Sequence, residues 1–505
     1  MAAAQDPFLE VRETHCAGVV LAGDRAFKFK KPVDLGFLDF RTQEARWRAC
    51  QQELELNRRF SPDVYLGLGE LSLPDGAREP VVVMRRMPED RRLATLVRHG
   101  ADVSECLRTL ARQLAVAHAR SRHAPEIDER AGVDALRRRW VANIDEARRS
   151  VPEVLAPAVF HEVEHAAHRF LDGRRHLFDR RVAEGCAVDG HGDLMADDVF
   201  CLADGPRALD CLEFDPALRY VDRLDDAAFL CMDLEHLGAP QLGEAFLGWY
   251  AEFSGDAAPT SLRHHYVAYR AFMRAKIACL RTDLGSRGVA EARLLLGIAR
   301  RHLQDGRVTL TLVGGLPGTG KTTLARALAD RLGAVVLSSD RIRKELARLD
   351  PQRSAAAAYG AGIYTEEHTG QCYAELLRQA RSLLELGESV VLDASWSAAE
   401  HRQTARALAR ETFSDLAEVR CVAAPELVQQ RLALRRAQRH LAGNHLSDAD
   451  AAVATVMAGR FAAWPESLLV DTAEPAEELA ERLAAMVRPS APYAAPQPRS
   501  LMVAD

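Results

Sequence analysis

The clearest chemistry in the sequence lies in one glycine-rich stretch. Residues 309–328 read TLTLVGGLPGTGKTTLARAL, which is an apolar run, a glycine-rich turn and a helical segment in that order. Glycines let backbone N–H groups converge on phosphate oxygens, and the helix that follows adds its positive N-terminal dipole. The spacing G-x-x-x-x-G-K-[ST] predicts a nucleotide phosphate site. Its predicted members are Gly315, Leu316, Pro317, Gly318, Thr319, Gly320, Lys321, Thr322 and Thr323.

Neighbouring polar residues could complete this site. Lys321 is expected to reach the β and γ phosphates of ATP, and Thr322 to ligate Mg²⁺. The next expected strand, AVVLSSD, ends at Asp340, which could act as a catalytic base for a substrate hydroxyl, but an aspartate there could also cap the next helix. Asp393 ends the run SVVLD, where a carboxylate can hold the metal.

Three arginines could either bind an anionic group or be ordinary solvated side chains. Arg431 and Arg435 lie four residues apart in QQRLALRRAQRH, so one face of a helix would carry both. They could close over the phosphates as a lid, or they could be ordinary solvated arginines. Arg343 could contact an anionic acceptor, or it could lie on a solvated helix face.

A second constellation of acidic residues lies in VDGHGDLMADDVFCLADGPRALDCLEFD, residues 188–215. In kinase-type phosphoryl transfer, one aspartate orients the acceptor hydroxyl, and a residue five positions on and a later aspartate hold Mg²⁺. Asp193, Asp198 and Asp210 match these three roles, and a hairpin is expected between the last two.

Upstream residues could clamp a nucleotide over this second constellation. Lys28 lies in the β-like run RAFKFKKP, and Glu53 lies on the helix that follows. A strand lysine paired with a helix glutamate would bind the α and β phosphates. Lys30 lies on the same face of the strand and is the competing choice.

The elements that must position these residues fall into two groups. Short β-like runs at 16–30 and 78–87 flank a charged helix at 41–59, which predicts a small mixed lobe over about 10–90 and a helical lobe over about 91–303. From 304 to 487, five apolar runs alternate with helical stretches. This alternation predicts a three-layer α/β/α domain with a parallel sheet. The Pro-rich residues 488–505 are expected to form a disordered tail.

Length, net charge and cysteine spacing limit the number of domains, the partners and the compartment that the sequence predicts. A chain of 505 residues exceeds what one core usually supports, so at least two domains are expected. The net charge of −6 disfavours nucleic acid as a partner, although a local basic groove stays open. No segment reads as a secretory signal or a membrane span. The ten cysteines form no CxxC pairs, which fits reduced thiols in a cytoplasmic protein.

The C-terminal features resemble the P-loop kinases that phosphorylate small hydroxyl acceptors, including the zeta-toxin and polynucleotide-kinase-like groups. The resemblance covers residues 306–487. An AAA-type ATP-binding domain would have the same P-loop motif. Because only a short stretch follows the last strand, no helical lid domain of a full AAA+ motor fits there.

The N-terminal order resembles the aminoglycoside phosphotransferase-like, or protein-kinase-like, fold. More narrowly, KKPVDLGFLDF, ELELNRRFSPDVYLG, HGDL and LDCLEFDPALRYVDRLDDAAFLCMDLEH look like an uncharacterised bacterial family that joins this domain to a P-loop kinase domain. The sequence departs from that pattern twice, with Met195 where the family has His and Asp198 where it has Asn. The altered ligand set could change metal number or nucleotide affinity.

These observations imply an α/β and α+β protein of two domains, in which a bilobal protein-kinase-like part precedes the P-loop domain. The leading hypothesis is an ATP- and Mg²⁺-dependent phosphotransferase, or kinase, with two candidate nucleotide sites and a small hydroxylated acceptor. One alternative is a P-loop ATPase or kinase regulated by a catalytically degenerate kinase-like sensor. Another is a nucleic-acid 5′-hydroxyl kinase. The acceptor, the coupling between the halves and the oligomeric state stay open.

Overall fold

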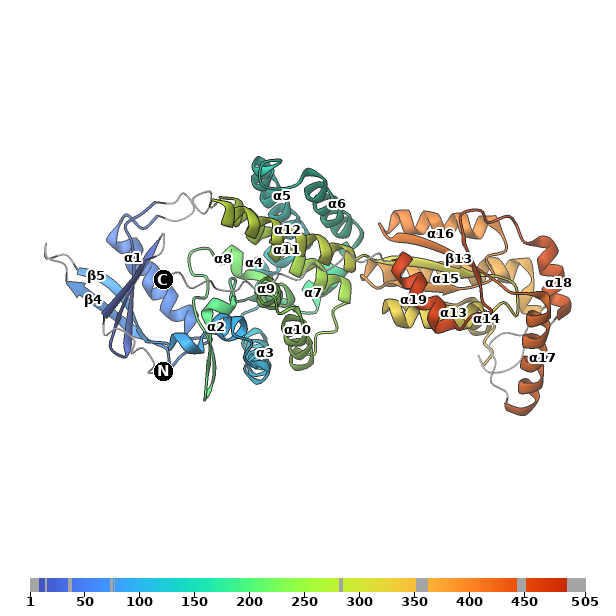
Figure 1. The fold of residues 1–505 in the computed structure, drawn as a ribbon, viewed down its shortest axis with the longest axis horizontal. Coiled ribbons are helices and arrows are strands. Elements are labelled where there is room, and N and C mark those ends of the chain that lie inside the picture. Colours follow the sequence, from blue (N-terminus) through green and yellow to red (C-terminus); the bar gives the residue numbers. More distant parts are fainter. Residues whose placement is uncertain are drawn as a thin grey trace, which may run out of the picture.

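The computed structural model describes residues 9–13, 16–34, 39–72, 76, 78–280, 285–350, 362–442 and 451–487. The molecule is elongated, with an antiparallel sheet at one end, a helical lobe in the middle and a parallel-sheet domain at the other end (Figure 1). The tail expected at 488–505 lies outside the described residues. Among the described residues, no helix has the length and apolar character needed to cross a membrane.

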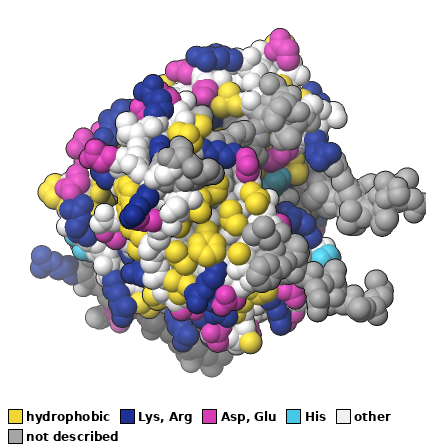
Figure 2. Space-filling view, turned by 90° about the vertical axis from the view of Figure 1, so that its left-hand side faces the viewer, with side chains coloured by type: hydrophobic (Ala, Val, Ile, Leu, Met, Phe, Trp, Pro, Cys, Tyr) yellow, Lys and Arg dark blue, Asp and Glu magenta, His cyan; other side chains and the backbone are white. Residues whose placement is uncertain are grey.

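The N-terminal lobe is a five-stranded antiparallel sheet covered by one helix. The strand order is β1-β2-β3-β5-β4. One sheet face packs on α1 through Cys50, Leu54, Val82 and Met84. Hydrophobic side chains also gather in the centre of the outer surface at this end of the molecule (Figure 2). The elements are β1 (Leu9–Glu13), β2 (Ala17–Ala22), β3 (Arg25–Lys30), α1 (Gln43–Asn57), β4 (Tyr65–Ser72) and β5 (Arg78–Arg85).

The helical lobe surrounds an aromatic core. Trp140 packs against Tyr269 and Phe272, and both Phe160 and Phe272 are fully buried. The helices are α2 (Leu93–Arg98), α3 (Ser104–Ala119), α4 (Pro125–Ala131), α5 (Val133–Ala147), α6 (Pro157–Gly173), α7 (Arg175–Ala183), α8 (Pro216–Arg219), α9 (Arg223–His236), α10 (Pro240–Ser254), α11 (Thr260–Leu280) and α12 (Ser286–Asp305). Two small ladders pair β6 (Ala187–Asp189) with β9 (Tyr220–Asp222) and β7 (Val199–Leu202) with β8 (Gly205–Ala208).

The C-terminal domain is the expected three-layer structure. Its parallel sheet has the order β11-β12-β10-β13-β14, and each strand corresponds to one of the apolar runs. Helices α13 and α19 cover one face, and α15 and α16 cover the other (Figure 1). The strands are β10 (Thr309–Gly314), β11 (Val335–Ser338), β12 (Val390–Asp393), β13 (Asp415–Val422) and β14 (Leu468–Asp471). The helices are α13 (Lys321–Leu332), α14 (Ser339–Leu346), α15 (Glu366–Glu385), α16 (Ala399–Glu411), α17 (Pro425–Ala442), α18 (Ala451–Arg460) and α19 (Ala476–Val487).

The helical lobe and the P-loop domain pack directly together. One hydrophobic cluster runs from the helical lobe into the α15 and α16 face of the parallel sheet. Polar contacts add to this junction: Ser261 Oγ donates to Gly387 O at 2.7 Å, and the buried Arg174 donates to Thr412 O at 2.6 Å. The two parts therefore share an interface that is partly apolar core.

The prediction that all ten cysteines are reduced is wrong for one pair. Cys106 on α3 and Cys201 on β7 form a disulfide with a Cα–Cα distance of 5.8 Å. The pair is 95 residues apart in sequence, so its proximity depends on the fold and not on a local spacing. The other eight cysteines are free.

Candidate functional sites

The glycine-rich turn has the backbone geometry that a phosphate-binding loop requires. Strand β10 is buried along its whole length and ends just before the turn. Gly315, Gly318 and Gly320 have φ values of 141°, 84° and 81°, a region that other L-residues rarely adopt. A Cβ on Gly318 would lie 2.9 Å from Val428 Cγ1, so α17 packs directly on the turn. Helix α13 then begins at Lys321, as predicted.

Side chains on the far side of the turn hold its backbone. Thr319 Oγ1 donates to Leu316 O at 2.8 Å, and Thr472 Oγ1 donates to Thr319 O at 2.7 Å. Arg431 donates from Nη1 to Thr472 Oγ1 at 3.0 Å and from Nη2 to Thr472 O at 2.7 Å. Arg431 thus lies beside the loop and is not an ordinary solvated arginine. Arg435 is on α17, but its side chain lies outside the described part of the structure.

The remaining loop residues face different surroundings. Leu316, Pro317 and Thr319 line a cavity of about 370 Å³ that α17 and α18 also border. Lys321 and Thr322 are half-buried in the first turn of α13, whereas Thr323 is exposed.

Asp393 is placed directly beside the phosphate loop. It pairs in register with Val313 of β10 and with Ser338 of β11, so its side chain is at the carboxyl edge of the sheet. The side chain is buried, its Oδ1 has no hydrogen-bond partner, and Thr322 hydrogen-bonds to the carboxylate. Burial raises the pKa of Asp393, while the charge of Lys321 acts in the opposite direction.

Asp340 lies close to Asp393 but on a different element from the one expected. Strand β11 ends at Ser338, so Asp340 belongs to the first turn of α14. Its charge contributes to the raised pKa of Asp393, which shows that the two carboxylates are near each other. The N-cap residue of α14 is Ser338 and not Asp340.

Arg343 is not on a solvated helix face. It is buried and donates to Ile363 O and Thr369 Oγ1, both at 3.0 Å. Its guanidinium also lies 5.0 Å from the centre of the Tyr364 ring. These contacts tie α14 to α15.

In the N-terminal lobe, one glutamate binds both candidate lysines. Glu53 is fully buried, with Oε1 2.8 Å from Lys28 Nζ and Oε2 2.7 Å from Lys30 Nζ. Burial alone would raise the pKa of Glu53, but the two ammonium groups hold it below its usual value. Lys28 also pairs with Asp210, and Lys30 pairs with Glu213. Lys28 therefore links Glu53 to Asp210, whereas Lys30 links Glu53 to Glu213.

The three predicted aspartates form one cluster. The hairpin of β7 and β8 connects Asp198 to Asp210, as expected. Burial raises the pKa of Asp198, and the charges of Asp210 and Asp193 raise it further. Burial raises the pKa of Asp193 to about 6. The three carboxylates thus act on one another, while cations such as Lys28, Arg92 and Arg274 act in the opposite direction. Among the described residues, no group of three or more His, Cys, Asp or Glu side chains is arranged to hold one metal ion.

Asp210 has a strained backbone that side chains from the N-terminal lobe hold in place. Its φ is 64°, and its side chain is about half exposed. Its N–H donates to Tyr65 Oη at 3.1 Å, and the next N–H, of Cys211, donates to Asn57 Oδ1 at 2.8 Å. These bonds fix the direction of the Asp210 carboxylate, next to Lys28.

A buried carboxylate of α9 supports the loop that carries Asp193. Asp226 accepts from the N–H groups of His191 at 2.8 Å and Gly192 at 2.7 Å, and His118 Nε2 lies 2.9 Å from it. Burial alone would raise the pKa of Asp226, but these hydrogen bonds lower it below its usual value.

Sequence reasoning assigned no role to Asp226, Tyr65 or Asn57. Asp226 follows Asp225 at the start of DDAAFLCMD, and acidic residues at the start of an apolar helical run are the signal that could have found it. Met195, one of the two departures from the family pattern, packs against the core of the helical lobe.

Comparisons with known proteins match parts of the chain and nearly the whole of it. Residues 310–464 match the AAA domain family. Among solved structures, a putative kinase from Chloroflexus aurantiacus is 22% identical, covering 37% of this chain and 99% of that chain with a TM-score of 0.30. A choline/ethanolamine kinase family protein from Mesorhizobium loti is 14% identical, covering 60% and 94% with a TM-score of 0.36. The GDP complex of aminoglycoside 2′-phosphotransferase-IIIa is 17% identical, covering 58% and 92%, also with a TM-score of 0.36. At such scores, the fold assignment rests on the strand orders and contacts described above.

Two curated relatives extend along nearly the whole chain. Uncharacterized protein Rv2004c of Mycobacterium tuberculosis and uncharacterized protein Mb2027c of Mycobacterium bovis are each 47% identical over 474 residues, which is 94% of this chain and 94% of each relative. The chain thus belongs to the family of these mycobacterial proteins, and it joins a protein-kinase-like part to a C-terminal P-loop domain.

Proposed function

We propose that the protein is an ATP-dependent phosphotransferase with two nucleotide sites, of which at least one transfers the γ-phosphoryl group to a small hydroxylated acceptor. The observation that carries the proposal is the glycine loop between β10 and α13, with the buried Asp393 beside Thr322. Phosphoryl transfer needs mainly positioning and charge neutralisation, which both sites are built to provide.

In the P-loop site, the backbone N–H groups of the glycine loop and Lys321 hold the β and γ phosphates. Arg431 neutralises phosphate charge, a role that its hydrogen bonds to Thr472 beside the loop support. Asp340 is the candidate base that accepts the proton of the acceptor hydroxyl. The effect of its charge on Asp393, the residue next to Thr322, supports this role.

In the N-terminal site, Lys28 binds the α and β phosphates, and Glu53 fixes the position of Lys28. Asp193 accepts the proton of the acceptor hydroxyl, and Asp226 holds the loop that carries Asp193. A base with a pKa of about 6 is mostly ionised at neutral pH and can still take up a proton.

The residues present fit Mg²⁺ at both sites. Asp393 has an unmatched buried oxygen next to Thr322, and in the other site the charge of Asp210 raises the pKa of the buried Asp198, as expected for two carboxylates that could share a cation. Thr322 and Asp393 would hold the ion in one site, and Asp198 and Asp210 in the other. When bound, Mg²⁺ neutralises the charge that develops on the phosphates.

Single and double variants of the full chain test the proposal. Lys321→Ala should abolish the ATP consumption of the P-loop site, and Asp193→Ala should abolish that of the N-terminal site. Both activities are measured with labelled ATP and a screen of metabolites as acceptors. Undiminished ATP consumption in the double variant would reject the proposal. If Asp193→Ala changes only the rate of the Lys321-dependent reaction, the N-terminal half is a sensor and not a second enzyme.

A further inference from the structure

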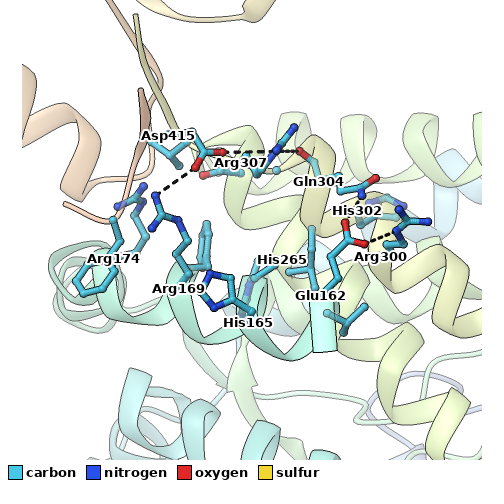
Figure 3. A pocket seen from close by; sticks show the side chains of 18 residues that line it. Glu162, His165, Arg169, Arg174, His265, Arg300, His302, Gln304, Arg307 and Asp415 are labelled. Atoms are coloured by element: carbon cyan, nitrogen blue, oxygen red, sulfur yellow. Dashed lines mark hydrogen bonds and ion pairs between the residues drawn. The ribbon is translucent and has the colours of Figure 1, made fainter. Parts of the chain in front are cut away.

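A separate cavity of about 400 Å³ lies between the helical lobe and the P-loop domain (Figure 3). Its lining comes from α6, α11 and α12 and from residues at the start of β13, and it includes none of the proposed nucleotide-site residues. Phe170, Leu303 and Phe413 give it an apolar wall, and the exposed His165 lies at its rim. This volume is within the range of small-molecule sites.

One end of the cavity has an excess of positive charge. Asp415 lies 3.2 Å from Arg169 and 3.6 Å from Arg307, and Figure 3 shows Arg174 at the same end. Arg174 is only 1% exposed, and its hydrogen bonds go to backbone carbonyls and a hydroxyl, including Thr412 O at 2.6 Å. Burial, together with the charge of Arg169, lowers the pKa of Arg174 to about 9. Among the residues that line this end of the cavity, Asp415 is thus the one carboxylate beside three guanidinium groups, and Glu385, which is outside the lining, also acts on Arg174. At the other end, Glu162 is paired with Arg300 at 2.8 Å.

Three residues that line the cavity carry buried donor atoms that lack acceptors. Among the described residues, Arg174 Nε, Arg307 Nη2 and His265 Nδ1 have no hydrogen-bond partner. Trp140 Nε1, which can only donate, bonds to His265 Nε2 at 3.2 Å, so the hydrogen of the neutral ring is on Nδ1. Burial lowers the pKa of His265 to about 3, which keeps the ring neutral. Gln304 Oε1 adds an unmatched acceptor, which fits a hydroxyl group on a ligand.

We propose that this cavity binds a small organic anion, whose phosphate or carboxylate group lies against Arg169, Arg174 and Arg307 and whose apolar part packs on Phe170 and Phe413. An anion provides the negative charge that the guanidinium groups lack and the acceptor atoms that the buried donors lack. A neutral apolar molecule provides neither.

The site goes beyond the proposed phosphotransferase function and does not depend on it. Its ligand would contact the helical lobe and the start of β13 together, and β13 pairs with β10, the strand that leads into the glycine loop. A bound anion therefore stabilises the observed packing of the two domains.

Calorimetric titration of the full chain tests the site, with phenyl phosphate and benzoate as probes and benzyl alcohol as the neutral control. The titrations use the Lys321→Ala background so that the P-loop does not hold the phosphate probe. We expect saturable, one-to-one binding of at least one anion, and the tighter probe identifies the preferred acid group. Absence of saturable binding by both anions, or equal binding of benzyl alcohol, overturns the proposal.

Two variants locate the binding. Ala166→Phe fills the cavity and keeps every arginine, whereas Arg307→Gln removes one unmatched donor and its charge; each should weaken the anion at least tenfold. Arg138→Gln removes an exposed arginine of α5 outside the cavity and should leave the affinity unchanged. The thermal unfolding midpoint checks that each variant folds, and if Ala166→Phe does not fold, Arg307→Gln decides. Unchanged affinity in the folded variants contradicts the proposal.

Discussion

The two proposed nucleotide sites differ in what holds the phosphates. In the P-loop domain, the cradle is one contiguous turn whose glycines have left-handed or related φ values, and its main polar groups are backbone N–H groups. In the N-terminal part, the site consists of ion-paired side chains from distant positions: Lys28 on β3, Glu53 on α1 and Asp210 after β8. One site depends on backbone shape, and the other depends on matched charges.

This difference predicts different sensitivities. A methyl group in the P-loop should be as damaging as the loss of a charge, because it changes the backbone path. In the N-terminal site, a residue that does not contact the nucleotide can still be essential, because each ion-paired side chain fixes the position of its partner. The following substitutions test this comparison, from the largest expected effect to the smallest.

Gly318→Ala should strongly weaken Mg·ATP at the P-loop. An L-residue at φ 84° is strained by about 1–2 kcal/mol, and contact of the new Cβ with Val428 adds about 1–3 kcal/mol, so the affinity should fall on the order of 100-fold. Gly370→Ala is the matched control, because a Cβ there meets nothing within 4 Å on helix α15. The control should keep its ATP affinity and gain about 1 kcal/mol of stability. Equal ATP affinity in both variants, measured by calorimetry, would contradict the backbone account.

Asp226→Asn should reduce turnover at the N-terminal site while leaving its ATP affinity nearly unchanged. The amide cannot accept both N–H groups of His191 and Gly192, and one unsatisfied buried donor costs about 1–3 kcal/mol, so turnover should fall about tenfold to a hundredfold. The assay uses the Lys321→Ala background, so that only this site is measured. Asp197→Asn, an exposed carboxylate on the same segment, is the control. Turnover that matches the control would remove Asp226 from the site.

Lys28→Met and Lys30→Met form a matched pair, because each removes one charge from Glu53. Lys28 also contacts Asp210, so its loss should raise the KM for Mg·ATP at the N-terminal site about tenfold, as expected for a charged hydrogen bond. Lys30 contacts Glu213 instead, so its loss should act mainly on the thermal unfolding midpoint. The opposite order of the two KM effects would show that Lys30 is the phosphate-binding lysine.

Much of the P-loop half is predictable because its signals are local. All five apolar runs became strands of one parallel sheet, and α13 begins at the predicted lysine. The N-terminal lobe was harder to predict. The strands β1 and β4 were not anticipated, since LEVRE is mostly charged and YLGLGELS contains two glycines and no β-branched residue. Neither segment carries a clear strand pattern.

The choice between Lys28 and Lys30 could not be made from the sequence for a geometric reason. Residues two apart on a strand face the same side, and the two oxygens of Glu53 reach both ammonium groups. Only their second partners, Asp210 and Glu213, distinguish them. The Cys106–Cys201 pair and the support from Asp226 likewise depend on long-range packing that leaves no fixed spacing in the chain.

Calorimetric titration of the full chain with Mg²⁺ and a non-hydrolysable ATP analogue measures the central claim most directly. The account predicts two bound nucleotides in the natural sequence and one in Lys321→Ala, with the affinity of the remaining site lowered about tenfold on adding Lys28→Met. A stoichiometry that Lys321→Ala leaves unchanged would contradict it.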